Sequence, residues 1–147
     1  MIKGGYTIFD HTADVGLKAW GISLPHLFRY VTQGMLTIIG NGYQNGKIIR
    51  YPLSVTADTA EELLLRWLKE ILFLIERESI LIQAFHFETI NLGKHRSNCC
   101  YLKASICGYK HYKIRHDFCT EIKAITRHLF QVKKSLFIWK ANLIFDV

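Results

Sequence analysis

The chain has 147 residues, half of them hydrophobic, and its 19 Lys and Arg exceed its 12 Asp and Glu, for a formal net charge of +7. This length and composition predict one compact globular domain and argue against a disordered chain. The charge favours an acidic partner, such as RNA or a protein that works on RNA, although a solvated basic surface is the simpler explanation of charge alone.

Membrane insertion and export find no support in the sequence. The longest apolar stretch, residues 63–75, is interrupted by three charged side chains and falls short of the ~20 residues of a membrane span. The first residues contain no continuous apolar segment like that of a secretion signal. We therefore expect a cytoplasmic protein whose cysteines are reduced, because they form no C-x-x-C pair. The cysteines are Cys99, Cys100, Cys107 and Cys119.

A dense polar stretch lies near the start of the chain. Residues 9–16 read Phe-Asp-His-Thr-Ala-Asp-Val-Gly and carry two carboxylates, an imidazole and a hydroxyl within five positions. Strand patterns over Tyr6 to Phe9 and Val15 to Gly21 flank it, so these polar residues are expected on a connecting loop. A plain turn and a functional site explain the composition of this stretch equally well.

Two amphipathic helices follow from the spacing of apolar residues. Ser23 is the predicted N-cap of a helix from Leu24 to about Ile39. A second, largely buried helix is expected within Thr59 to Arg77, where Asp58 and Glu61 have the spacing of a capping box. Each helix carries one apolar face and is predicted to pack on a sheet.

The remaining patterns predict strands. Pro52 indicates an edge strand or a bulge, and residues 80–109 indicate a long hairpin. Strands outnumber helices, and the helices come early in the chain. The sequence therefore predicts an α+β fold, with a mainly antiparallel or mixed sheet packed with two helices in a single domain over residues 1–147. The expected strands are Lys47 to Ala57, Ile80 to Leu92, Cys99 to Tyr109, Cys119 to Ile125, His128 to Val132 and Leu136 to Asp146.

The C-terminus places two oxygen ligands side by side. The chain ends on a strand pattern, with the carboxylate of Asp146 followed by the α-carboxylate of Val147. A further carboxylate from elsewhere would complete a site for Mg²⁺ or Ca²⁺, which prefer oxygen donors. Common enzyme signatures are missing from the sequence, including Walker A, G-x-G-x-x-G, G-x-S-x-G and H-E-x-x-H.

Four separated motifs resemble those of the archease family. His11 to Asp14 is similar to its H-T-A-D signature, Leu65 to Glu76 to its W-L-N-E-L-L helix, Glu121 to His128 to its K-A-V-T-Y-H segment, and Phe145 to Val147 to its F-D-V end. The motifs occur in order over nearly the whole chain. The departures are Lys69 for the usual Asn, Arg127 for Tyr, and Tyr109 where Glu is common.

The resemblance implies an archease-like fold and an accessory protein in place of an enzyme. Such proteins promote guanylylation of the active-site histidine of the RNA ligase RtcB and so sustain its turnover in tRNA splicing and RNA repair. The partner is then an RtcB-type ligase, with its tRNA or other RNA reached indirectly and no membrane involved. The resemblance also implies a divalent metal, Ca²⁺ or Mg²⁺, held by Asp14, Asp146 and Val147.

Three further residues are expected to assist activation or contact the ligase. Lys123 suits a contact with the ligase or with phosphates, and its alternative is an ordinary lysine that faces solvent. His11 is expected to anchor the turn, with metal ligation or proton transfer as the other possibilities. Thr12, like Asp10, is a candidate partner of the metal's ligands.

Two other functions stay open from the sequence. A small metal-dependent phosphohydrolase would use the same carboxylates, but the chain offers no evident nucleophile or general base beyond His11. A basic RNA-binding module is the other alternative, and its affinity would fall steeply with salt.

Overall fold

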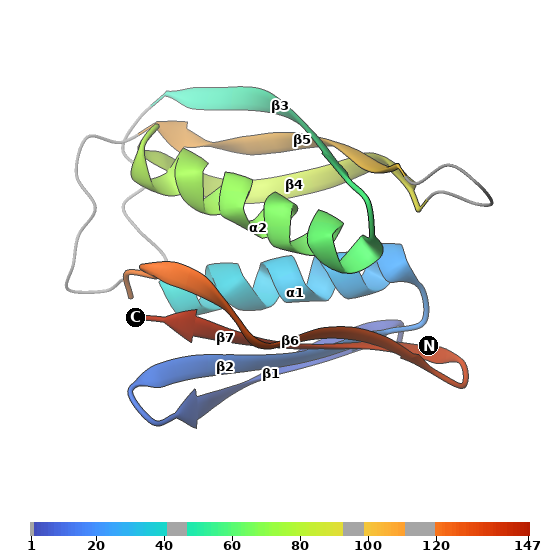
Figure 1. Ribbon diagram of the computed structural model, residues 1–147. Helices are drawn as coiled ribbons and strands as arrows, with labels where there is room; N and C mark the ends of the chain where they lie inside the picture. Colours follow the sequence, from blue (N-terminus) through green and yellow to red (C-terminus); the bar gives the residue numbers. More distant parts are fainter. Residues whose placement is uncertain (1, 41–46, 93–98, 111–119) are drawn as a thin grey trace. The chain divides into compact units, whose positions relative to one another are not determined.

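The computed structural model describes residues 2–40, 47–92, 99–110 and 120–147, and contacts divide the chain into two compact units. Unit 1 comprises Met1–Gly40 and Cys119–Val147, and unit 2 comprises Asn41–Phe118. Each unit is described by itself. The elements, labelled in Figure 1, are β1 (Gly4–His11), β2 (Asp14–Gly21), α1 (Leu24–Ile39), β3 (Ile48–Ala57), α2 (Ala60–Glu76), β4 (Ile80–Asn91), β5 (Cys100–Lys110), β6 (Ala124–Ser135) and β7 (Ile138–Asp146).

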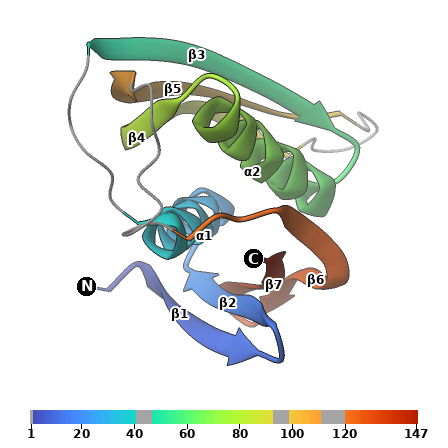
Figure 2. The ribbon, with the colours of Figure 1, turned by 90° about the vertical axis from the view of Figure 1, so that its left-hand side faces the viewer.

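Unit 1 is a four-stranded sheet in the order β1-β2-β7-β6 with α1 on one face (Figure 2). Side chains alternate between the two faces of each strand. On β2 the buried side chains of Leu17 and Ala19 face the helix. Leu17 lies so close to Gly34 of α1 that a Cβ atom on Gly34 would not fit. On β7, Leu143 and Phe145 are likewise fully buried. The core of this unit therefore lies between α1 and one sheet face.

The predicted first helix is confirmed at both ends. The Ser23 hydroxyl accepts a hydrogen bond from the backbone N–H of His26, so Ser23 is the N-cap. The helix ends at Ile39, and the N–H of Gly40 donates to the carbonyl of Leu36. Gly40 has a φ of 90°, a conformation that glycine adopts without steric cost.

Unit 2 is a three-stranded sheet in the order β3-β5-β4, and α2 packs on it. Pro52 lies on β3, which is an edge strand as predicted, so its missing N–H interrupts no central ladder. The buried Trp67 of α2 contacts Phe85 and Phe87 of β4, at ring-centroid distances of 6.3 and 5.2 Å. This aromatic cluster forms part of the core of unit 2.

The predicted start of the second helix was wrong by one residue. Thr59, and not Asp58, is the N-cap, because its backbone is extended and its hydroxyl accepts from the N–H of Glu62. The cap therefore pairs Thr59 with the N–H of Glu62, and the predicted pair of Asp58 with Glu61 lies one residue too early.

Two strand predictions near the C-terminus are also corrected. Two separate strands were expected at 119–125 and 128–132, but residues 124–132 belong to one strand, β6, and residues 120–123 precede it outside any strand. Residue 119 lies outside the described residues. The register of β6 against β7 shifts between Thr126 and Gln131, and this irregularity breaks the alternation that sequence patterns rely on. Leu136, expected to begin the last strand, lies in a turn with a φ of 53°.

The α+β class is confirmed, with two helices and seven strands among the described residues and antiparallel pairing in every described ladder. The strands form two sheets. That residues 1–147 make one domain stays a prediction. No helix in the described part of the chain is long and apolar enough to cross a membrane.

Candidate metal centre

The polar stretch near the N-terminus forms a tight hairpin and not the loop expected from sequence. β1 extends to His11 and β2 begins at Asp14, so only Thr12 and Ala13 form the turn. His11 and Asp14 are directly paired across the hairpin. Thr12 is exposed and has a φ of 44°, a left-handed conformation that is uncommon for a non-glycine residue. Backbone pairing thus fixes both ends of the turn.

Pairing between β2 and β7 brings Asp146 to the same end of the sheet. Val15 pairs with Phe145, and each strand has its aspartate one residue further on, Asp14 before Val15 and Asp146 after Phe145. Because side chains alternate, the two aspartates share one sheet face, opposite to that of the buried Phe145. Both are half-buried. In Figure 1 the C-terminus and the β1–β2 turn lie at the same end of unit 1.

The last residues are also fixed by the chain before β6. The N–H of Lys123 donates to the carbonyl of Asp146 over 2.7 Å, and Ala124 pairs with Asp146. The neighbouring Ile122 is buried with 2% of its side chain exposed, which anchors this segment, while Lys123 itself is exposed. The lysine therefore lies beside the chain end with its backbone held in place.

His11 supplies an unpartnered buried atom at this end. Its Nδ1 is buried and has no hydrogen-bond partner within the part of the chain that the structure describes. A buried ring nitrogen without a partner is costly, so such an atom points to a ligand, an ion or a water molecule. Residue pairing places this imidazole next to Asp14.

The donor chemistry of this end fits a divalent cation. Two half-buried carboxylates on neighbouring strands repel each other, and a bound cation would offset that repulsion. In the described ranges, no three His, Cys, Asp or Glu side chains gather as a ready metal cluster. A complete shell would therefore need another donor, and the one predicted from sequence is Val147, a half-buried residue.

The structure thus brings all the residues proposed from sequence to one end of unit 1. These are His11, Thr12, Asp14, Lys123, Asp146 and Val147. Sequence reasoning missed two details, the unpartnered Nδ1 of His11 and the bond between the backbones of Lys123 and Asp146. The first depends on burial and has no sequence signal. For the second, the strand expected over Cys119 to Ile125 indicated backbone pairing but not the partner strand.

Known proteins match this chain over nearly its full length. A family model for the archease protein family (MTH1598/TM1083) matches residues 6–147. The protein archease of Methanosarcina acetivorans is 32% identical over 143 residues, which cover 97% of this chain and 95% of the relative. The protein archease of Pyrobaculum islandicum is 31% identical over 146 residues, with the same coverage of 97% and 95%.

Solved structures agree with this result. The solution structure of protein 1598 from Methanobacterium thermoautotrophicum has a TM-score of 0.76 and 26% identity, covering 97% of this chain and 99% of that one. The crystal structure from Thermotoga maritima that is described as an archease and possible chaperone has a TM-score of 0.57 at 18% identity, covering 95% and 94%, and shows likeness of fold. The family match, the relatives and the fold together establish that this chain belongs to the archease family.

Proposed function

We propose that this protein activates an RtcB-type RNA ligase by promoting transfer of GMP to the ligase's active-site histidine. The protein would act as an accessory factor in tRNA splicing or RNA repair and would not itself catalyse ligation. The family membership supports a role of this kind, and the resemblance of the four sequence motifs suggests the partner.

One observation carries the proposal to particular residues. The pairing of β1, β2 and β7 puts His11, Asp14 and Asp146 at one end of the sheet, although the two aspartates are far apart in the sequence. A ligand there would contact both ends of unit 1's chain. The half-buried carboxylates and the unpartnered Nδ1 of His11 support a binding role over a purely structural one.

Asp14, Asp146 and the carboxylate of Val147 would hold the divalent metal, Ca²⁺ or Mg²⁺. A bound cation supplies positive charge that offsets phosphate charge on a nucleotide or on RNA. The pairing of β2 with β7 would hold the two aspartates in register, while the buried Phe145 packs on the opposite face of the sheet. His11 would orient Asp14 or a bound water molecule, and Thr12 lies at the exposed tip where it can reach the ligase.

Lys123 would contact the ligase or a phosphate. Its side chain is exposed, while its N–H is fixed to the carbonyl of Asp146 at 2.7 Å. A point charge on a fixed backbone suits recognition of a phosphate or a carboxylate. Lys123→Ala should reduce activation and leave metal binding unchanged, which separates this role from that of the aspartates.

Ligase–GMP formation tests the proposal. Purified ligase with GTP is mixed with wild-type protein, Asp14→Asn or Asp146→Asn, and the labelled ligase–GMP adduct is counted over time. We expect stimulation by wild type and its loss in both variants. Asp58→Asn is the matched control, since Asp58 is an exposed aspartate in unit 2. Full stimulation by both site variants, or none by wild type, refutes the proposal.

The role of Val147 has its own test. Adding residues after Val147 removes a free carboxylate at that position, and we expect metal affinity to fall by at least about tenfold. Calorimetric titration of Ca²⁺ and Mg²⁺ measures the change. Unchanged affinity would leave the two aspartates as ligands and remove Val147 from the set.

A further inference from the structure

The sheet of unit 1 has a second face, turned away from α1, which we call the outer face. Residue pairing arranges it in rows across the strands. Lys18 pairs with Asn142 in one row, and Trp20 pairs with Lys140 in the next. Lys140 in turn pairs with Lys133 of β6, which extends that row. The outer face is therefore built by β2, β7 and β6, with β1 at its edge.

Basic side chains dominate these two rows. Lys18, Lys133 and Lys140 are all exposed. Lys133 and Lys140 lie directly opposite each other, an arrangement of like charges that costs stability in a sheet. The other outer-face positions of these rows are neutral, so no carboxylate in the rows offsets the charge. Those positions are Gly5, Thr7, Trp20, Gln131 and Asn142. A bound polyanion would offset this repulsion.

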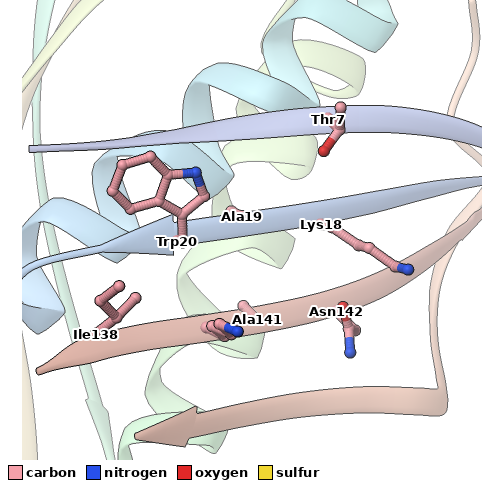
Figure 3. Close-up of a pocket in the computed structure, with 8 residues that line it drawn as sticks. Thr7, Lys18, Ala19, Trp20, Ile138, Ala141 and Asn142 are labelled. Atoms are coloured by element: carbon pink, nitrogen blue, oxygen red, sulfur yellow. The ribbon is translucent and has the colours of Figure 1, made fainter. Parts of the chain in front are cut away.

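An aromatic ring lies among the lysines. The half-buried Trp20 extends its indole over Gly5 of β1, close enough that a Cβ at Gly5 would lie 3.4 Å from the indole nitrogen. The Nζ atom of Lys18 lies 5.3 Å from the ring centre of Phe9. Figure 3 shows Trp20 and Lys18 projecting from β2, with Asn142 and Ile138 on β7. Together they line an open hollow of about 430 Å³.

We propose that the outer face of unit 1 binds single-stranded RNA. Lys18, Lys133 and Lys140 would contact successive phosphates, and Trp20 would stack against one base. Lysines beside an accessible aromatic ring are the combination by which proteins bind single strands, since every base has a face that can stack. Trp20 is half-buried, so part of its ring is accessible. A duplex keeps its bases stacked on one another and cannot use the ring.

The position of this surface connects it with the metal centre. Asp14 lies on the same strand and the same face as Trp20, six positions earlier, which corresponds to roughly 20 Å at ~3.3 Å per residue. A single strand of RNA that crosses the rows, parallel to β2, would thus lead toward the carboxylate end. RNA binding goes beyond the proposed function and can be measured on the isolated protein, without the ligase.

Fluorescence anisotropy of a labelled oligouridine, titrated with the protein over a range of salt concentrations, tests the proposal. With three lysine–phosphate contacts, the slope of log K against log salt should be about −2, and each Lys→Ala variant should reduce its magnitude by roughly 0.7. Lys103→Ala, an exposed lysine on β5 of unit 2, is the matched control and should leave the slope unchanged.

Trp20 has a distinct signature in the same titration. Trp20→Ala should weaken binding by about tenfold and leave the salt slope unchanged, whereas Trp20→Phe should retain most of the affinity because phenylalanine also stacks. Thermal unfolding of each variant checks that it is folded. If Trp20→Ala does not fold, the lysine variants still test the surface.

Three results would overturn the proposal. The first is no change of slope in the three lysine variants. The second is equal affinity for the single strand and for a duplex of the same length, which would mean attraction to phosphate charge alone. The third is displacement of the RNA by polyglutamate at equal charge concentration, which would indicate an acidic protein as the partner of this face.

Discussion

The two units share one plan, an antiparallel sheet with a helix on one face, but they place their side chains differently. In unit 2 the large aromatic side chains form a packed cluster, because Trp67 is 0% exposed and contacts Phe85 and Phe87. Unit 1 instead has half-buried Asp14 and Asp146 at one end of its sheet and the unpartnered Nδ1 of His11 beside them.

The difference separates stability from binding. Buried aromatic side chains contribute to folding and offer no chemistry to a partner. Half-buried carboxylates and an unpartnered imidazole can bind a ligand, but they lower the stability of the fold until the ligand is bound. Substitutions in the core of unit 2 should therefore unfold the protein, and substitutions at the carboxylate end of unit 1 should change binding with little effect on folding.

The largest effect on stability is expected from Trp67→Ala. Removing this fully buried ring leaves a cavity beside Phe85 and Phe87, and such a change lowers the free energy of unfolding by roughly 3–5 kcal/mol. Chemical denaturation measures the loss. Trp20→Ala, a half-buried tryptophan of unit 1, is the control and should cost clearly less. Equal losses at both positions would erase the contrast between the units.

Asp14→Asn should reduce metal binding strongly and leave the stability of the fold nearly unchanged. We expect metal affinity to fall by about tenfold or more. Without metal, the free energy of unfolding should stay within about 0.5 kcal/mol of wild type or rise, because one of two neighbouring charges is gone. Calorimetric titration and denaturation of the same sample give both numbers. Destabilisation as large as that of Trp67→Ala would mean that Asp14 serves the fold.

Leu136→Gly should stabilise unit 1 by up to about 1 kcal/mol. Leu136 has a φ of 53° in the two-residue turn between β6 and β7, where a leucine is strained and a glycine is not. Its side chain is 87% exposed, so the substitution removes little packing. Phe137→Gly, at the next position and 86% exposed, lacks the positive φ and should not stabilise. A lower thermal midpoint for Leu136→Gly would contradict this account of the turn.

The smallest effect concerns pH. Burial, together with Lys3 and Arg29, lowers the pKa of His26 from its ordinary value of 6.5. The unfolded chain then takes up the proton more readily, so the contribution of His26 to stability is present above pH 6.5 and is lost as the pH falls below it. Denaturation about one pH unit above and below that value should show a smaller decline in His26→Gln than in wild type. Equal declines would show that another group dominates.

Sequence patterns were most informative where a rule is local. Ser23 marked the start of the first helix, and Pro52 was compatible with an edge strand, because capping and missing N–H groups act within a few residues. The patterns were weaker where pairing decides. The irregular register of β6 between Thr126 and Gln131 made one strand resemble two.

The candidate site could be predicted in its members but not in its geometry. Asp14 and Asp146 stood out as carboxylates near the two ends of the chain, and the family motifs linked them. Their placement on one face depends on the pairing of β2 with β7, which no local pattern encodes. The unpartnered Nδ1 of His11 depends on burial by surrounding residues, so the sequence could not predict it either.

One titration tests most directly whether Asp14 and Asp146 hold the same ion. Ca²⁺ and Mg²⁺ affinities are measured for wild type, Asp14→Asn, Asp146→Asn and the double variant, with Asp58→Asn as the control. If both carboxylates bind one ion, each single variant should lose most of the affinity and the double variant should lose little more, because residues that share a ligand are not additive. Independent, additive losses, or wild-type affinity in either single variant, would contradict the shared site.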